Sequence, residues 1–571
     1  MPWIENTIFY TIYPLGFCGA PENNDGVTEY RLDKINDWLP HIKELGVKAI
    51  VFNPVFESSK HGYDTTDYYK IDCRLGDNQS FKKLCRTLHD NGIKVLLDGV
   101  FNHVGRDFAY FTDVRKNLQM SKYCGWFKNL NFNGNSPYND RFTYEGWAGN
   151  YDLVKLNLQN SEVVEHLLGA VKMWINEFGI DGLRLDAADC IDESFFRQLR
   201  QTCDSIKDDF WLYGEIIHGD YRRWANPEML DSVTNYECYK GLYSSHNDHN
   251  YFEIAHSLER QFGSSGMYKG LYTYNFVDNH DVNRIGSVVR DKQYLRNIHT
   301  LLFTMPGAPS IYYGSEWAIE GTRTNYSDRE LRPCLDIMNI KNPDMVLLNH
   351  LIALGKIRNN LSALQNGSFE NVLIKNEQLV IKRKNDEQTV YIALNLSSIE
   401  QWVEYKVDGC GVLTDVLNEN TGFECSNIVK MPIPAFSSRI LVLNDGSFRI
   451  DTDKAAADSF QSIPAVIGQD IEGHDKSAED NSEHDNHGSE CREKAKEDTL
   501  KIQPVRIGRY RHFKGNEYEV TGFARHSETL EDMVVYRALY GERGLWVRPY
   551  GMFSDIVEKD GKRQLRFTPI D

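Results

Sequence analysis

The repeating unit of this chain can be seen in residues 161–187, SEVVEHLLGAVKMWINEFGIDGLRLDA. Apolar residues recur at helical spacing as far as Phe178, which predicts an amphipathic helix. Ser161 is a suitable N-cap residue, and Gly179 suits the left-handed position that ends many helices. The run GLRLDA that follows predicts a buried strand. A helix followed by a strand, repeated along a chain, is typical of a parallel sheet with crossover helices.

The same alternation extends from Ile8 to about Leu354, and a second helical pattern covers residues 32–46. Eight repeats predict an α/β fold, a closed (β/α)8 barrel within residues 1–364. An open doubly wound sheet is the alternative, but no glycine-rich phosphate loop follows the first strand. The expected strands are 8–14, 48–55, 93–100, 182–187, 210–216, 232–237, 272–279 and 310–314.

One connection is much longer than the others. Residues 102–150 are rich in Asn, Gly, Tyr and Trp and follow no clear period. Loops of this length in a compact domain are uncommon and tend to be functional. Because the segment follows the third strand, we expect an inserted domain at the carboxyl end of the barrel.

The chain changes character after residue 364. Residues 365–446 alternate polar and apolar positions in short runs, which predicts an all-β sandwich. Residues 447–503 are acidic and nearly free of large apolar side chains, which predicts a disordered linker. Residues 504–571 regain strand-like alternation and are interpreted as a small β-rich module.

Composition narrows the class of partner. The formal net charge of −18 over 571 residues disfavours nucleic acid. The eleven cysteines are scattered without metal-like spacing, so we expect no metal cluster and reduced thiols, as in a cytosol. The sequence contains neither a leader-like start nor an apolar run long enough to cross a bilayer, and we expect a cytoplasmic protein with no membrane partner.

The candidate chemistry lies at strand ends. Asp98, Asp186, Glu215 and Asp281 end or follow the third, fourth, fifth and seventh expected strands. Such ends open on one face of a (β/α)8 barrel, where catalytic groups normally lie. Four carboxylates in one mouth repel each other, so their clustering indicates a function such as glycoside hydrolysis. Taken singly, Asp98 could equally cap the next helix.

Three basic or imidazole groups accompany these acids: His103, Arg184 and His280. Arg184 and Asp186 occupy alternate positions of one strand, so both side chains point to the same face. We therefore expect the guanidinium to keep Asp186 ionised at neutral pH.

Four segments now indicate a family. DGVFNHV (98–104), GLRLDAAD (182–189), GEIIH (214–218) and FVDNHD (276–281) resemble, in order, the signature regions of the α-amylase family, glycoside hydrolase family 13. The resemblance covers about residues 1–446. It implies that Asp186 is the nucleophile and Glu215 the general acid/base of a retaining hydrolase.

The same resemblance implies roles for further residues. Asp281 is the third carboxylate of such sites, and HGYDTTDYYKID (61–72) is similar to the loop that follows the family's second strand. The implied substrate-binding residues are Tyr63, Asp64, Asp98, His103, Arg184, His218, His280 and Arg284. Aromatic residues of the long insertion and beyond it, Trp126, Tyr144, Trp147 and Trp317, are either sugar platforms or local packing.

Within the family, LVKLN (153–157) resembles a stretch of neopullulanase-like and cyclomaltodextrinase-like members. This implies hydrolysis of α-1,4 bonds in maltooligosaccharides, with Ala187 favouring that linkage over α-1,6. Asp189 and Cys190 replace a Lys-His pair of classical α-amylases. We expect no required cofactor, while calcium stays an open alternative because Asn102 occupies the position of one ligand.

Other functions stay open beside this one. The nearest is a 4-α-glucanotransferase, in which a sugar hydroxyl replaces water. An isomerase or phosphorylase of the family and an inactive binding scaffold are further alternatives. The tail, with GRYRHFKGNEYEV and LWVRP, resembles a small bacterial domain of unknown function, and it could bind a protein or ligand partner.

Overall fold

The computed structural model describes residues 2–324, 327–444, 505–513, 515–525, 532–540, 544–553, 556–559 and 562–570. These fall into two compact units, divided near residue 460. The linker predicted for residues 447–503 lies outside the described residues. In the described part of the chain, no helix is both long and apolar enough to span a membrane.

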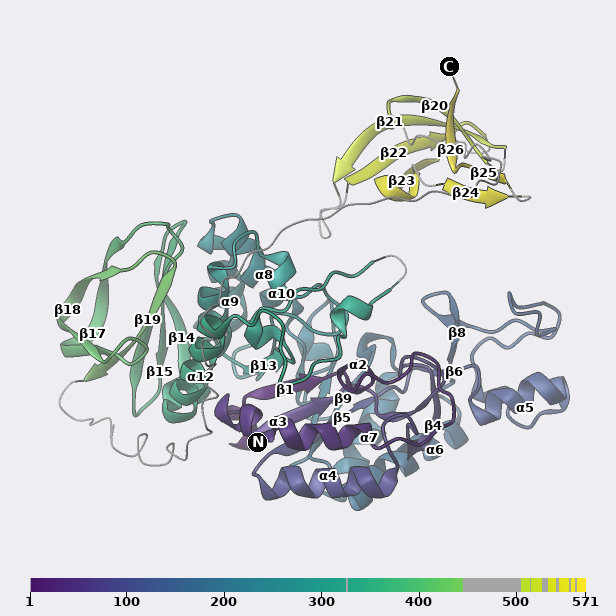
Figure 1. Cartoon of the computed structure of the whole chain (residues 1–571), viewed down its shortest axis with the longest axis horizontal. Coiled ribbons are helices and arrows are strands. Elements are labelled where there is room, and N and C mark those ends of the chain that lie inside the picture. The colour runs from purple at the N-terminus through teal and green to yellow at the C-terminus, as the bar shows by residue number, and fades with distance from the viewer. Residues whose placement is uncertain are drawn as a thin grey trace, which may run out of the picture. The chain divides into compact units, whose positions relative to one another are not determined.

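The first unit is built on a parallel eight-stranded sheet in the order β11-β10-β9-β5-β2-β1-β13-β12 (Figure 1). A parallel bridge between Thr234 and Tyr274 joins the two edges, which closes the sheet into the predicted barrel. Its strands are β1 (Phe9–Ile12), β2 (Ala49–Phe52), β5 (Lys94–Gly99), β9 (Gly182–Leu185), β10 (Trp211–Gly214), β11 (Ser232–Val233), β12 (Tyr274–Asn275) and β13 (Ala308–Tyr312).

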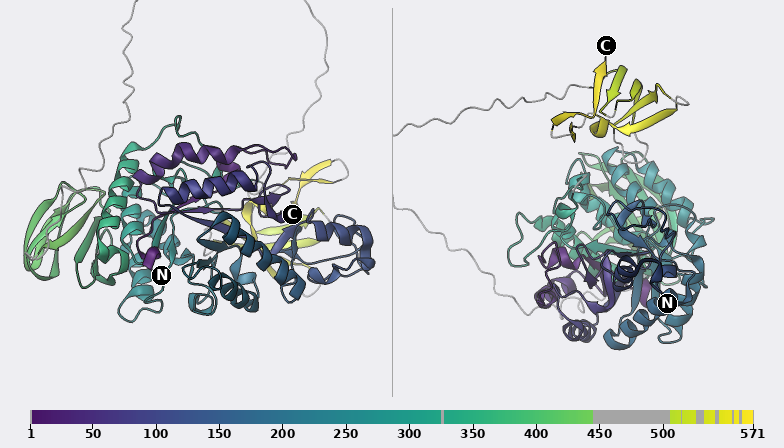
Figure 2. Two further views of the ribbon diagram at one scale, coloured as in Figure 1. Left: turned by 90° about the horizontal axis from the view of Figure 1, so that it is seen from below. Right: turned by 90° about the vertical axis from the view of Figure 1, so that its right-hand side faces the viewer.

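Helices surround these strands (Figure 2). Their apolar faces pack into one large core, in which Trp38 and Trp174 are fully buried. The main helices are α3 (Ile35–Glu44), α4 (Asn78–Asp90), α6 (Ser161–Met173), α7 (Glu193–Asp204), α8 (Tyr236–Asn247), α9 (Tyr251–Phe262), α11 (Tyr294–Thr304) and α12 (Met345–Asn360).

Two local predictions need correction. The N-cap of α6 is Asn160, whose side chain accepts from the Glu162 amide at 2.9 Å, and Ser161 is the first helical residue. The strand expected at 232–237 is only two residues long, because the Asn235 side chain caps α8 by accepting from the Cys238 amide. The prediction for Gly179 is confirmed, since it ends the helical segment at φ 74°.

The amino-terminal ends of the strands are held by one buried acid. Asp181 accepts from the Val95 amide at 2.9 Å and contacts His89, Lys94 and Lys207 at 2.9, 3.0 and 2.8 Å. Although burial raises it, these partners hold the pKa of Asp181 well below its usual value. This end of the barrel is therefore tied together by charge.

The long insertion after β5 is ordered. It holds β6 (His103–Gly105), α5 (Ala109–Asn117), β7 (Gly146–Trp147) and β8 (Asn150–Lys155), with the three strands in the order β6-β8-β7. The helix α5 was not expected from the sequence, because its hydrophobic stripe is short and only Phe111 and Val114 are buried.

Six antiparallel strands follow the barrel and form the predicted β-sandwich. Its interior is a separate apolar cluster that includes Val380, Tyr391, Val403 and Met431. The strands are β14 (Ser368–Ile374), β15 (Gln378–Lys384), β16 (Thr389–Asn395), β17 (Gln401–Asp415), β18 (Thr421–Ile433) and β19 (Ser437–Asn444).

The second unit is a small β-rich module, as predicted. A five-stranded antiparallel sheet in the order β23-β22-β21-β20-β26 packs on α15 (Tyr550–Phe553), where Phe553 and Phe567 stack at 4.0 Å. Its strands are β20 (Gly508–His512), β21 (Glu517–Arg525), β22 (Asp532–Ala538), β23 (Leu545–Pro549) and β26 (Phe567–Ile570). Between β23 and β26 in the sequence, β24 (Ile556–Lys559) and β25 (Lys562–Leu565) pair as an antiparallel hairpin.

Candidate active site

Neighbouring strands carry the candidate acids to one end of the barrel. Asp98 lies in β5 opposite Arg184 of β9, and Leu185 of β9 lies opposite Gly214 of β10. Asp186 and Glu215 are therefore the next residues of two paired parallel strands, whose carboxyl ends share one edge.

One guanidinium joins three of these carboxylates. Arg184 Nη1 lies 2.5 Å from Asp98 Oδ2 and 3.2 Å from Asp186 Oδ1, and its Nη2 lies 2.7 Å from Glu215 Oε2. All four residues are buried or nearly so. Although burial lowers it, Asp98 and Glu215 hold the pKa of Arg184 well above its usual value.

The pKa of Asp186 is shifted in the direction opposite to the prediction. Burial raises the pKa of Asp186 well above its usual range, and Glu215 and Asp98 raise it further. Arg184 lowers that pKa but does not outweigh burial, because it divides its charge among three acids. Burial raises the pKa of Asp98 as well, so these two aspartates retain protons to higher pH than exposed aspartates would.

The fourth acid is held differently. Asp281 Oδ2 lies 2.8 Å from His280 Nε2, and its Oδ1 lies 3.0 Å from Arg332 Nη2. Although burial raises it, these two partners hold the pKa of Asp281 well below its usual value. The Tyr63 hydroxyl connects this pair to the rest, because it lies 2.5 Å from His280 Nε2 and donates to Asp98 at 3.1 Å. Asp281 is therefore a fixed anion beside the group formed by Arg184 and its three carboxylates.

His103 lies near the second carboxylate oxygen of Asp186, the one that Arg184 does not contact. Its Nε2 is 4.0 Å from Asp186 Oδ2, and its ring stacks on Trp147 at 5.1 Å. Among the described residues this Nε2 has no hydrogen-bond partner, although it is buried. Burial, with some repulsion from His61, lowers the pKa of His103 to about 3. A neutral imidazole with an unused nitrogen is suited to binding a hydroxyl group.

Three predicted binding residues are not joined to this cluster. Asp64 is buried and accepts from the His61 amide at 3.0 Å. His218 is exposed. Arg284 is fully buried, donates to the Tyr313 carbonyl at 2.8 Å and stacks over Tyr312. These contacts show that Arg284 supports the fold beneath the site, and its binding of sugar stays a prediction.

The structure also adds residues that the motifs did not indicate. Arg332 lies 51 residues beyond Asp281 in a loop without periodicity, so no sequence signal pointed to it. The Tyr236 hydroxyl lies 3.3 Å from Glu215 Oε1, and the Ala187 amide donates to Glu215 Oε2 at 3.2 Å. Ala187 adopts a left-handed backbone at φ 45°, which directs this amide.

The aromatic candidates divide into two groups. Trp126, Tyr144 and Trp317 are buried and are therefore local packing. Trp126 donates to Glu162 at 2.9 Å, and Trp317 stacks on His41 at 4.5 Å. Trp147 alone of the four is partly exposed, beside His103, and stays a candidate sugar platform.

One further cluster has metal-like composition. Glu57, Asp72 and Cys73 bring possible ligand atoms within 4.8 Å of one another. Protein groups already use these carboxylates: Glu57 accepts from Asn24 at 2.8 Å, and Asp72 accepts from Arg74 at 2.6 Å. In the described part of the chain this is the one such cluster, and its hydrogen bonds explain it without an ion.

Comparison with known proteins agrees with this geometry. Residues 11–345 match the family described as alpha amylase, catalytic domain, and residues 508–569 match a protein family of unknown function, DUF1653. The chain is 32% identical to the maltogenic alpha-amylase of Bacillus acidopullulyticus over 71% of each chain. It is 31% identical to a cyclomaltodextrinase of a Bacillus species, over 69% of this chain and 73% of the relative.

A solved cyclomaltodextrinase structure has a TM-score of 0.69 and 28% identity, covering 77% of this chain and 78% of the other. Its similarity spans most of the first unit. The chain therefore belongs to the α-amylase family, glycoside hydrolase family 13, and is a glycoside hydrolase that carries a DUF1653 domain at its carboxyl end.

Proposed function

We propose that the protein hydrolyses α-1,4 bonds of maltooligosaccharides with retention of anomeric configuration. The observation that carries this proposal is that the two terminal nitrogens of Arg184 bind Asp186 and Glu215. Two carboxyl groups on one guanidinium face the same small space. Retaining glycosidases need a separation of about 5–5.5 Å, whereas inverting enzymes need room for a water molecule between the acids.

In the first step, a carboxylate oxygen of Asp186 attacks the anomeric carbon and forms a covalent glycosyl-enzyme. The bond to the leaving oxygen breaks with its electron pair, and that oxygen takes the proton of Glu215. In the second step, the Glu215 carboxylate removes a proton from water while the water oxygen attacks the same carbon. The bond to Asp186 breaks with its electron pair as the new bond forms, and both carboxyl groups return to their starting forms.

The neighbouring groups would hold the sugar whose bond is cut. Asp281 is a fixed anion that can accept from sugar hydroxyls and favour ring distortion. His103 offers an unused imidazole nitrogen beside Asp186, and Tyr63 offers an aromatic face. His218 and Asp64, which lie outside the cluster, are proposed only for sugars further along the chain.

The substrate class rests on the relatives. Maltogenic amylase and cyclomaltodextrinase are the names of proteins that share the barrel and about a third of its residues. A relative from Bacillus subtilis is named as intracellular, which supports a cytoplasmic location for this chain. We propose that no cofactor is required, because the carboxylates supply the proton and the nucleophile.

The test is product analysis with maltohexaose and a Glu215→Gln variant. Glutamine keeps the shape that contacts Tyr236, but its amide cannot act as a general acid. We expect shorter maltooligosaccharides from the native protein and a loss of at least about 10³-fold in the variant. Glu228→Gln, an exposed change, is the matched control and should keep full activity.

The configuration of the new reducing end separates the mechanisms. Proton NMR in the first minutes should show the α-anomer, and an initial β-anomer would contradict the covalent intermediate. Products longer than maltohexaose would instead identify a 4-α-glucanotransferase, in which a sugar hydroxyl takes the place of water. If no α-glucan gives a product that depends on Glu215, the remaining function is that of a binding scaffold.

A further inference from the structure

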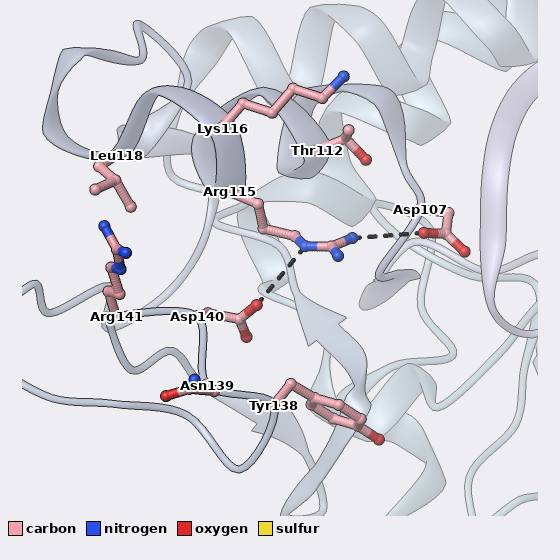
Figure 3. A pocket seen from close by; sticks show the side chains of 9 residues that line it. All are labelled: Asp107, Thr112, Arg115, Lys116, Leu118, Tyr138, Asn139, Asp140 and Arg141. Carbon is pink, nitrogen blue, oxygen red and sulfur yellow. Dashed lines mark hydrogen bonds and ion pairs between the residues drawn. The ribbon is translucent and has the colours of Figure 1, made fainter.

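A second hollow lies on the inserted domain, away from the four acids. Its volume is about 460 Å³, within the range of small-ligand sites. Figure 3 shows its walls, formed by α5 on one side and the turn at residues 138–141 on the other. Its polar lining includes Tyr138, Asp140, Arg141, Asp107 and Arg115.

The centre of the hollow is a fixed arrangement of planar polar groups. Arg115 lies between two carboxylates, 3.5 Å from Asp107 and 3.7 Å from Asp140. Asp140 is buried and forms a two-bond pair with Arg106 at 2.8 and 2.9 Å. The Asp107 side chain is 70% exposed, and its second oxygen accepts from the Ser59 hydroxyl at 3.1 Å. The wall thus offers donors and acceptors that are held in place without a ligand.

The facing turn is held in an uncommon backbone conformation. Asn139 and Arg141 both have φ of 62°, and Leu118 on the opposite wall has φ of 52°. The Arg141 amide donates to the Asn135 side chain at 2.9 Å, which fixes the turn. Among the described residues the Arg141 guanidinium has no partner, and Figure 3 shows it alongside Leu118 at the hollow.

Tyr138 supplies an aromatic surface. Arg106 packs over its ring at 4.0 Å and Asp152 accepts from its hydroxyl at 2.7 Å, yet the residue stays 48% exposed. A held aromatic ring beside planar polar groups is suited to a sugar ring. Hydroxyls of different sugar units can donate to Asp107 and accept from Arg141, which Figure 3 shows at opposite sides of the hollow, whereas an anion would meet repulsion from the carboxylates.

We infer that this hollow is a non-catalytic binding site for an α-glucan chain. The choice of glucose as the sugar unit rests on the proposed function. The strand β6 runs from His103 of the catalytic cluster toward Asp107 of the hollow. Four residues span at most about 14 Å, so one glucan chain of several units can reach both places. The hollow would hold long substrates beside the barrel mouth.

Affinity electrophoresis of the full chain through a gel that contains amylopectin tests this site. The measurements use Glu215→Gln protein, so binding is read without turnover and stays informative if the proposed reaction is wrong. Arg141→Ala and Tyr138→Ala are each expected to raise the dissociation constant for amylopectin about tenfold. Arg86→Ala, an exposed arginine on α4, is the matched control and should not change migration.

Kinetics of the active protein supply the second measurement. The Arg141 and Tyr138 variants should raise KM for amylopectin and leave kcat/KM for maltotriose unchanged, because a short substrate does not reach the hollow. Unchanged retardation of both variants would overturn the proposal. So would release of amylopectin by excess inorganic phosphate, which would identify an anion site.

Discussion

Replacing Arg332 tests how the site holds its third carboxylate. Arg332 Nη2 contacts Asp281 at 3.0 Å, and its Nε donates to the His280 carbonyl at 3.1 Å. The guanidinium also packs over Tyr13 at 4.6 Å. In Arg332→Ala, Asp281 keeps only His280, so we expect the carboxylate to shift while the barrel stays folded.

The size of the effect follows from these contacts. Breaking a fully buried ion pair costs about 3–5 kcal/mol, but the Asp281 side chain is 33% exposed and keeps one partner. We therefore expect unfolding free energy to fall by only about 1–2 kcal/mol. A carboxylate misplaced by about 1 Å costs on the order of 10²-fold in rate, or about 2.7 kcal/mol of activation free energy.

The assay is the pH dependence of kcat and KM with maltohexaose, combined with thermal unfolding. Arg332 lowers the pKa of Asp281, so its removal should raise the pKa of Asp281, while the acid limb of activity set by the higher pKa of Asp186 should stay in place. Arg332→Lys should recover part of kcat, and Arg329→Ala, an exposed neighbour, should change nothing. Unchanged kcat with a higher KM would refute the reasoning, since Arg332 would then contact sugar instead of positioning Asp281.

Four further outcomes are expected. Asp181→Asn should lower the free energy of unfolding by about 3 kcal/mol at pH 7, measured by urea unfolding. Because the pKa of Asp181 is depressed, its stabilising contribution is present above about pH 4 and is lost as the pH falls below that value. Equal stability of the variant and the native protein at pH 7 would contradict this. The acid limb of kcat/KM should lie above the ordinary aspartate range, since the pKa of Asp186 is raised and ionisation is needed for attack; a limb below about pH 4 would refute it. Ala187→Val should lower kcat and stability by about 1–2 kcal/mol each, because a β-branched residue resists φ 45°, whereas Ala187→Gly should fold normally. Deleting residues 504–571 should leave turnover of maltotriose unchanged, and a large loss in the folded truncation would show that the tail takes part.

The sequence predicted the barrel well because its strands are buried on both faces. Runs such as 93–100 and 210–216 are short and mostly apolar, so they lack the polar face of an amphipathic helix and are identified as strands. The alternation of strand and helix then implied the topology. The residue parity of Arg184 and Asp186 likewise predicted a shared face. Short strands were harder: β11 has two residues, and Asn235 decides where it ends.

Other parts of the site depended on contacts between distant segments. Arg332 has no motif, and only the folded loop carries it to Asp281. Arg284 follows a motif closely, yet its side chain turns into the barrel wall toward Tyr313. The ionisation of Asp186 could not be judged from one neighbouring arginine, because the number of acids sharing Arg184 and the loss of water were both unknown.

The position of Asp186 directly after β9, two residues beyond Arg184, has a consequence for recovery of the protein from denaturant. The distance between these two residues is set within one short segment, but their relation to Glu215 depends on the pairing of Leu185 with Gly214. A one-residue slip of β10 would turn Glu215 away from the barrel interior. Misregistered molecules would then be inactive however compact they are, so an active-site titration would count correctly refolded molecules in a mixed preparation.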